Sequence, residues 1–201
     1  MVRNIIFDLG NVLLDYQPKE YLKLKNIEIA KIEDVYHQVF QSEEWILLDK
    51  GTITQDEAQE KIIERNPENT ILIECAFNHW YDMLTPIEDT VPLLKRLKQK
   101  GYNLYFLSNF HSLAFEHVND KYDFFTLFDG GVVSYKENTI KPDMEIYQKL
   151  IQKYSLKPQE SIFIDDMLYN VEAAKKLNFN GIHFTNANNL KDELKNYNIN
   201  L

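Results

Sequence analysis

The chain has 201 residues, of which 44% are apolar and 26% charged, and 31 acidic against 22 basic side chains give a net charge of −9. This composition is typical of a globular protein with a sizeable core, and the negative charge argues against nucleic acid or an anionic membrane as main partner. The single cysteine, Cys75, excludes a disulfide framework and a cysteine-ligated zinc site.

The remaining composition excludes several enzyme classes. Only six glycines are present, and their positions allow no dinucleotide fingerprint, P-loop or serine-hydrolase elbow. Cys75 is expected to be a buried apolar side chain in a reducing compartment. No apolar run is long enough to span a membrane and no signal peptide is evident, so the expected location is the cytoplasm.

The first predicted strand is the apolar run 5–7, which is typical of a strand buried on both faces of a parallel sheet. Residues 18–83 then contain no convincing strand. Helical patterns occur there at 20–25, 32–40, 54–65 and 71–81, and Thr54 with Glu57 forms a capping box at the start of the third. An insertion of about 70 residues is too long for an ordinary connection and predicts a helical subdomain.

From residue 87 onward, strands and helices alternate. Strands are predicted at 104–107, 131–133, 161–164 and 181–184, and helices at 91–100, 143–154 and 171–177, with left-handed stops at Gly101 and Asn178. This alternation predicts βαβ units and a parallel sheet. The expected fold is α/β: a Rossmann-like parallel-sheet core of residues 1–15 and 85–201, with an all-helical cap of residues 16–84.

Polar side chains follow three of the predicted strands. Asp8 ends the first strand, Ser108 and Asn109 end the second, and Asp165 and Asp166 end a later one. Such residues often only start loops or cap helices. Because right-handed crossovers bring the carboxyl ends of parallel strands to one edge, where ligands bind, the three clusters together favour a functional site.

Carboxylates that converge at one edge repel each other, and a divalent cation relieves this repulsion. Mg²⁺ is the expected ion, since it binds one or two carboxylates together with carbonyl, water and phosphate oxygens. Lys141, just before Pro142 and Asp143 at a helix start, is a candidate positive side chain. Taken alone, however, a lysine at such a position is more often solvated.

Four segments, in chain order, resemble the motifs of the haloacid dehalogenase superfamily. They are FDLGNVL at 7–13, LSN at 107–109, KPDMEIY at 141–147 and FIDDMLYN at 163–170. The sequence GTIT at 51–54, before an acidic helix, resembles the helical cap of the subgroup with an insertion after the first strand. Within the superfamily, the first and last motifs look most like the bacterial α-D-glucose-1-phosphate phosphatases.

The resemblance implies that Asp8 is a nucleophile, which forms an aspartyl-phosphate that water then hydrolyses. Ser108 and the amide of Asn109 would hold the phosphoryl oxygens. Lys141 would bridge the nucleophile and the phosphate as a fixed positive charge. The substrate implied is a small phosphorylated metabolite, such as the sugar phosphate glucose 1-phosphate, and the oligomeric state stays open.

The resemblance also implies a metal site. Mg²⁺ would be bound by Asp8, the Gly10 carbonyl and Asp166, with Asp165 and Asn170 positioning these ligands.

At Gly10 the sequence departs from the family pattern, in which most phosphatases carry a second Asp as acid for the leaving group and base for water. Missing acid–base assistance costs ~10²–10⁴ in rate. Either another group substitutes, or the leaving group needs little help, as an anomeric sugar phosphate would. Asp15 is a conceivable substitute, although a structural role at the hinge of the cap is favoured.

Three alternatives compete with this interpretation, and all but the phospho-receiver domain stay open. A C–halogen hydrolase also needs no acid, but attack on carbon needs no metal and leaves the Asp165–Asp166 pair unexplained. A phospho-receiver domain has its acidic pair first, an order that differs from the one found here. A non-catalytic or weakly active binding or regulatory protein could share the fold, because Gly10 lacks a side chain.

Substrate specificity is expected to reside in the cap. Tyr16, Gln41, Trp45 and His79 are polar or aromatic candidates, but their sequence context does not distinguish them from ordinary surface or core residues.

Overall fold

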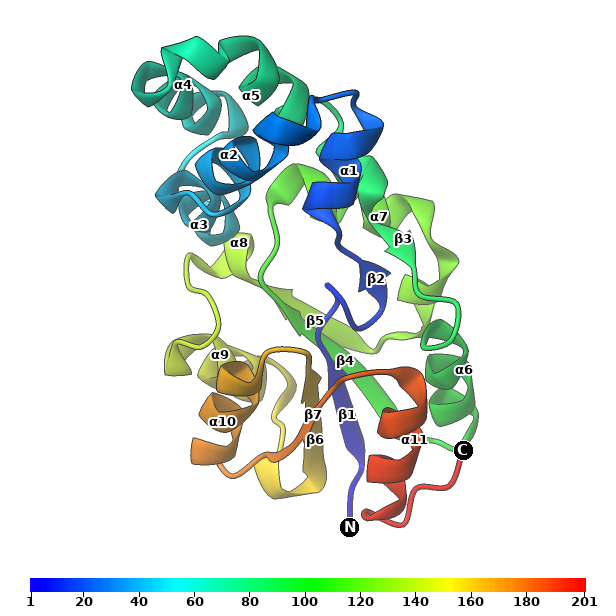
Figure 1. Cartoon of the computed structure of the whole chain (residues 1–201). Coiled ribbons are helices and arrows are strands. Elements are labelled where there is room, and N and C mark those ends of the chain that lie inside the picture. The colour runs from blue at the N-terminus through cyan, green and yellow to red at the C-terminus, as the bar shows by residue number, and fades with distance from the viewer.

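The computed structural model describes residues 1–201, and its centre is a five-stranded sheet in the order β5-β4-β1-β6-β7 (Figure 1). The strands are β1 (Asn4–Phe7), β4 (Asn103–Ser108), β5 (Gly130–Val133), β6 (Ser161–Asp165) and β7 (Asn180–His183). All four strand pairs are parallel. The predicted α/β class is therefore confirmed, and β1 is central and buried along its whole length.

Helices cover both faces of this sheet. They are α6 (Val91–Gln99), α7 (Ser112–Lys121), α8 (Ser134–Glu137), α9 (Met144–Tyr154), α10 (Leu168–Lys176) and α11 (Ala187–Lys195). Ile6 of β1 joins α9 and α10 in a cluster of 12 buried residues on one face. Ile5 and Phe7 point to the opposite face, where α6, α7 and α11 contribute to a cluster of 41 buried residues.

A helical insertion follows β1 and lies above the carboxyl ends of the strands (Figure 1). It contains α1 (Pro18–Leu24), α2 (Ile29–Phe40), α3 (Glu43–Lys50), α4 (Gln55–Arg65) and α5 (Thr70–Phe77), flanked by β2 (Leu14–Asp15) and β3 (Thr85–Pro86). β2 and β3 pair antiparallel, so the two passages of the chain between sheet and insertion run side by side. The division into a core and a cap stays a prediction, with this pair at its proposed boundary.

Short 3₁₀ turns complete the chain: η1 (Pro67–Asn69), η2 (Trp80–Met83), η3 (Asp123–Leu127) and η4 (Pro158–Glu160). None of the helices combines the length and the apolar character needed to cross a bilayer.

Several helix ends follow the predicted signals. The Thr54–Glu57 capping box forms at the start of α4. Gly101, at φ 84°, and Asn178, at φ 66°, lie in the left-handed region after α6 and α10. Gly51 ends α3 at φ 69°, and a Cβ atom there would lie 2.3 Å from the carbonyl oxygen of Tyr135, so only glycine fits this junction between the insertion and α8.

The sequence patterns miss four helices, α3, α7, α11 and the four-residue α8. In α3, residues 45–48 are consecutively apolar and give no helical period, and the helix start depends on the Ser42 hydroxyl, which accepts from the Trp45 N–H. The helix predicted at 71–81 is α5, which ends earlier because His79 is left-handed at φ 55°. The expectation that Cys75 is buried is wrong, since the side chain is half-exposed at the surface of α5.

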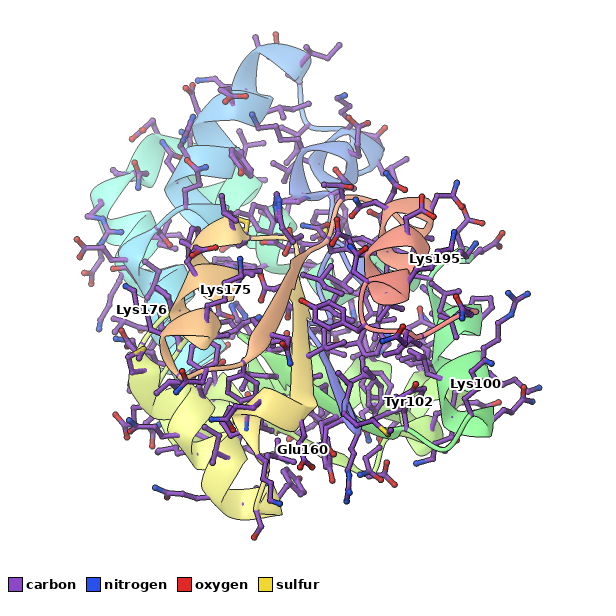
Figure 2. The ribbon with its side chains drawn as sticks, turned by 90° about the horizontal axis from the view of Figure 1, so that it is seen from below. Lys100, Tyr102, Glu160, Lys175, Lys176 and Lys195 are labelled. Carbon is purple, nitrogen blue, oxygen red and sulfur yellow. The ribbon has the colours of Figure 1, made fainter.

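Figure 2 views the opposite, amino-terminal edge of the sheet, marked by Tyr102 and Glu160, which directly precede β4 and β6. Lys175 and Lys195, labelled there on different helices, are paired with acidic neighbours one turn away. The acidic side chains that converge without such one-to-one pairing lie instead at the carboxyl edge of the sheet.

Candidate active site

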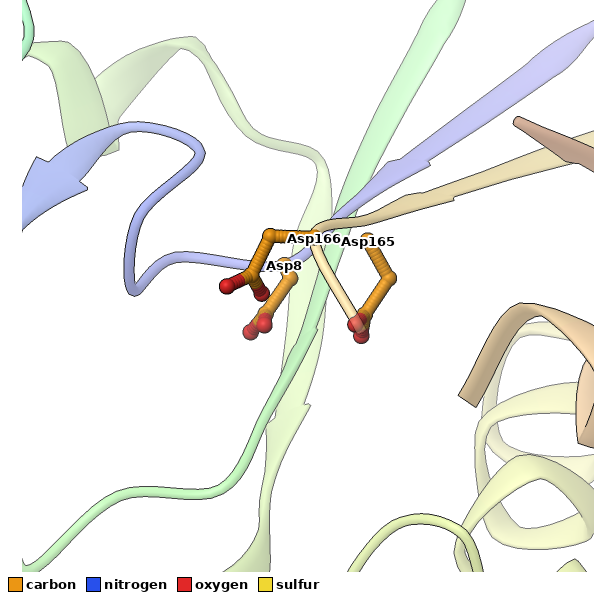
Figure 3. A group of neighbouring side chains, drawn as sticks. All are labelled: Asp8, Asp165 and Asp166. Carbon is orange, nitrogen blue, oxygen red and sulfur yellow. The ribbon is translucent and has the colours of Figure 1, made fainter. Parts of the chain in front are cut away.

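Three adjacent strands bring the predicted site residues together. Phe7 of β1 lies in register with Phe106 of β4 and Ile164 of β6, so the residues that follow these positions emerge side by side. Carboxylate oxygens of Asp8, Asp165 and Asp166 lie within 4.8 Å of one another (Figure 3). We refer to Asp8, Ser108, Lys141, Asp165 and Asp166 as the strand-end site.

Lys141 is buried in this site and not solvated, as a lysine at such a position more often is. Its Nζ lies 2.8 Å from Oδ1 of Asp8 and 2.6 Å from Oδ2 of Asp165, with 1% of the side chain exposed. Burial alone would lower the pKa of Lys141, but the two carboxylates outweigh this effect and raise it. The lysine is therefore a fixed positive charge.

Asn109 holds the backbone of Lys141 in place. The Asn109 side-chain amide donates to the Lys141 carbonyl at 3.0 Å, and its oxygen accepts from the Lys141 N–H at 2.8 Å. Both polar atoms of this side chain thus position the lysine.

Asp8 has two chemically different oxygens. Oδ1 accepts hydrogen bonds from the Ser108 hydroxyl at 2.6 Å and the Leu9 N–H at 2.7 Å, besides its ion pair with Lys141. Oδ2 accepts no hydrogen bond from the protein, so its lone pairs remain available. Burial raises the pKa of Asp8 to about 7, against the opposing effect of Lys141.

Asp165 and Asp166 differ in how many hydrogen bonds and ion pairs hold their carboxylate groups. Asp165 accepts from the Met167 N–H at 2.8 Å and from the Asn170 amide at 3.0 Å, and its other oxygen pairs with Lys141. Asp166 has only a 3.3 Å hydrogen bond from the Asn11 side chain, and burial, followed by the charge of Asp165, raises its pKa. Asp166 is therefore the more available metal ligand of the two.

The charge balance of the strand-end site fits a divalent cation. Three carboxylates face one ammonium group, an excess of two negative charges when all are ionised. Carboxylate oxygens of Asp8 and Asp166, together with the carbonyl of Gly10 two residues after Asp8, are the kind of donor set that Mg²⁺ prefers. A bound cation would also favour the ionised form of the carboxyl groups of Asp8 and Asp166.

A cavity of about 120 Å³ lies between the strand-end site and the insertion. Its lining is mostly aromatic and comprises Gly10, Tyr16, Trp45, Asp49, Trp80, Leu84, Asn109, Phe110 and His111. We call it the cap-side cavity. Of the predicted specificity residues, Tyr16 and Trp45 line it, whereas Gln41 and His79 are exposed and do not.

A larger cavity of about 430 Å³ opens between the α3–α4 loop and α7, and it shares His111 with the cap-side cavity. Gly10 and Asn109, which belong to the first two motifs, line the cap-side cavity but not this larger one, so we place the chemistry at the smaller cavity.

Sequence reasoning missed Asp49, His111 and the bridging role of Asn11. Asp49 sits in the unpredicted helix α3 and has no motif around it, so no local signal marks it. His111, two residues after Asn109, could have been suspected from its place beside a strand end. Asp15 lies on β2 and accepts from the exposed Gln17 side chain, outside the cap-side cavity.

Comparisons with known proteins identify a family for this chain. Residues 2–178 match a family model described as a hydrolase, haloacid dehalogenase-like. A sesquiterpene phosphatase from Aspergillus oryzae is 28% identical over 182 residues, covering 90% of this chain and 89% of that protein. D-ribitol-5-phosphate phosphatase from Bacteroides thetaiotaomicron is 24% identical over 211 residues, covering 96% and 97%.

A solved structure has the same fold over most of its length. It is the magnesium complex of a HAD family enzyme from Bacteroides thetaiotaomicron, with a TM-score of 0.72 and 25% identity, covering 92% of this chain and 93% of that one.

Proposed function

Because this chain belongs to the haloacid dehalogenase-like hydrolase family and is a hydrolase of the phosphatase type, we propose that it is a Mg²⁺-dependent phosphatase working through an aspartyl-phosphate on Asp8. The observation that carries the proposal is the free Oδ2 of Asp8, next to an oxygen fixed by Lys141 and Ser108. Fixing one oxygen of the carboxylate presents the other to phosphorus in a defined direction.

Charge neutralisation is the first requirement of this reaction. Two unit negative charges at ~4 Å repel by about 4 kcal/mol at an effective dielectric constant of 20. Lys141, buried beside Asp8, offsets this repulsion without reorganisation when the phosphate dianion arrives. Mg²⁺, held by Asp8, Asp166 and the Gly10 carbonyl, would supply further stabilisation of charge on the phosphoryl oxygens.

The neighbouring residues have supporting roles. Ser108 donates to Asp8 and is placed to donate to a phosphoryl oxygen instead once the substrate binds. Asn109 positions Lys141, and Asp165, held by Asn170 and the Met167 N–H, orients the same lysine from the opposite side. The insertion, which lies over the carboxyl edge, would exclude water while the aspartyl-phosphate forms.

For the substrate, we propose a small phosphorylated metabolite, with sugar phosphates such as glucose 1-phosphate as the first candidates. The sequence resemblance and the aromatic lining of the cap-side cavity, which suits the apolar face of a sugar ring, support this choice. The relatives act on other phosphates, a ribitol phosphate in one case. We also propose a cytoplasmic location, in keeping with the single cysteine.

The test is a substrate panel with Mg²⁺: glucose 1-phosphate, glucose 6-phosphate, ribitol 5-phosphate and farnesyl phosphate, each with the wild type and with Asp8→Asn. We expect phosphate release by the wild type only, fastest on glucose 1-phosphate. Release of halide from a 2-haloacid in the presence of EDTA, without phosphatase activity, would instead assign a C–halogen hydrolase.

A further inference from the structure

The cap-side cavity contains one carboxyl group, that of Asp49. Asp49 lies near the end of α3 and lines the cavity together with Gly10 and Asn109, which belong to the first two motifs. Its side chain keeps 22% of its surface accessible. A carboxyl group from the insertion therefore shares a small space with the position at which the family's usual acid is missing.

His111 is the direct neighbour of this carboxyl group. Its Nε2 lies 3.4 Å from Oδ1 of Asp49, is buried and has no hydrogen-bond partner. The imidazole ring packs between Trp45 and Trp80, with ring centroids 4.3 and 4.8 Å away. Burial lowers the pKa of His111 to about 3, so the ring is neutral and unable to neutralise Asp49 as an ion pair.

The surroundings of Asp49 favour its protonated form. Burial raises the pKa of Asp49 to about 8, with Lys141 opposing and Asp8 adding to this shift. Tyr16 lines the same cavity. The titratable side chains of α8, which packs against α3, are Tyr135, Lys136 and Glu137, and Glu137 is paired with Lys149.

From this geometry we infer that Asp49 replaces the missing side chain at Gly10: it protonates the leaving group and then activates the hydrolytic water. The inference rests on the proposed function, because it needs the aspartyl-phosphate on Asp8. His111 is the positioning residue, since its Nε2 can exchange a hydrogen bond with the Asp49 carboxyl group in either protonation state of that group.

The two steps balance in protons and bonds. In the first, an Asp8 oxygen bonds to phosphorus, the bond from phosphorus to the leaving oxygen breaks, and the Asp49 proton moves to that oxygen. In the second, Asp49 takes a proton from water, the water oxygen bonds to phosphorus, and the bond from phosphorus to Asp8 breaks. Phosphate leaves, Asp8 is again a carboxylate and Asp49 is again protonated.

Gly10 is not required by packing. A Cβ atom at Gly10 would meet nothing within 4 Å, and the backbone there is not left-handed. The absent side chain thus leaves room for a leaving group between Asp8 and Asp49. The same room makes Gly10→Asp a usable rescue variant.

The test compares two phosphates with leaving groups of different acidity, p-nitrophenyl phosphate and benzyl phosphate, by kcat/KM with Mg²⁺. Nitrophenolate leaves without a proton, whereas benzyl alcohol needs one. We expect Asp49→Asn to lose about 10²–10⁴-fold on benzyl phosphate and at most about tenfold on p-nitrophenyl phosphate. The quantity compared is the ratio of kcat/KM on benzyl phosphate to kcat/KM on p-nitrophenyl phosphate. Both values are measured on the same sample, so a change in the fraction of folded protein cancels from the ratio.

Three further variants complete the design. Gly10→Asp in the Asp49→Asn background should recover about tenfold or more on benzyl phosphate alone. Glu43→Gln, an exposed carboxyl-to-amide change in the same helix, is the matched control and should leave the ratio unchanged. If Asp49→Asn yields no folded protein, Asp49→Ser takes its place.

An unchanged ratio in a folded, active Asp49 variant would overturn the inference, and so would a selective loss in Asp15→Asn instead. If the wild type hydrolyses neither phosphate, the proposed function itself fails. The two failures are thereby distinguishable.

Discussion

The two halves of the proposed active site are built on different principles. The strand-end half, at the sheet, is a buried network in which Lys141 joins Asp8 and Asp165 with distances of 2.8 and 2.6 Å. The other half, which we call the insertion half, is the aromatic cap-side cavity, where Asp49 of the insertion meets His111 of the core at 3.4 Å and Nε2 of His111 has no hydrogen-bond partner.

This difference separates two electrostatic tasks. Phosphate recognition needs charges whose positions do not change, and the buried lysine held by two carboxylates and by Asn109 provides such a charge. Proton transfer needs a group that can hold its proton at neutral pH and release it, and a desolvated carboxyl group with few partners provides that. Substitutions in each half can show whether phosphate recognition and proton transfer are separate in this way.

The largest effect is expected at the nucleophile. Asp8→Asn keeps an oxygen that can accept from Ser108 but removes the attacking carboxylate, so activity should fall by on the order of 10⁴ or more. Phosphate release with Mg²⁺ present measures this loss, with Glu43→Gln, an exposed carboxyl-to-amide change, as the control. Activity within tenfold of the wild type would place the nucleophile outside the strand-end half.

The next effect concerns the metal. Asp166→Asn should weaken Mg²⁺ binding more than Asn170→Ala, because Asp166 is a proposed ligand whereas Asn170 only orients Asp165. For Asn170→Ala we expect about 10–100-fold weaker binding. Calorimetric titration and the Mg²⁺ dependence of activity measure both. The reverse order would assign Asp165 as the ligand.

Breaking the charge network should cost stability as well as activity. Lys141→Met leaves two buried carboxylates without their cation, and the free energy of unfolding without metal should fall by about 3–5 kcal/mol. Urea unfolding at pH 7 measures it. A loss below about 1 kcal/mol, as for an exposed ion pair, would mean that the network is open to solvent.

The smallest expected effect is a gain in stability, and it follows from replacing Asp49 in the insertion half. Folding raises the pKa of Asp49 from 3.8 to about 8, so the folded state holds a proton that the unfolded state releases, and stability falls as pH rises through this range. Asp49→Asn should remove this fall and stabilise the protein at pH 8 by at least about 1 kcal/mol, with little change at pH 4.

Urea unfolding in EDTA from pH 4 to pH 8 measures this stabilisation, with Glu43→Gln as the matched control. Parallel pH curves for the wild type and Asp49→Asn would show that Asp49 is ionised in the folded protein at neutral pH.

The sequence alone was sufficient for the sheet and for the residues at its carboxyl edge. Apolar runs that end in Asp8, Ser108 and Asp165 are local features, and right-handed βαβ crossovers bring the carboxyl ends of parallel strands to one edge of the sheet. Their convergence could therefore be predicted without coordinates, as could the stops at Gly101 and Asn178.

The insertion half was decided by tertiary structure. Residues 45–48 of α3 are consecutively apolar although only Trp45 and Leu48 are buried and Ile46 is exposed, so no helical period marks the helix. The burial of Lys141 and the meeting of Asp49 with His111 depend on segments far apart in the chain. Asp49 becomes buried, and its pKa is raised, only when the insertion packs over the sheet. No local pattern in the sequence therefore encodes this chemistry.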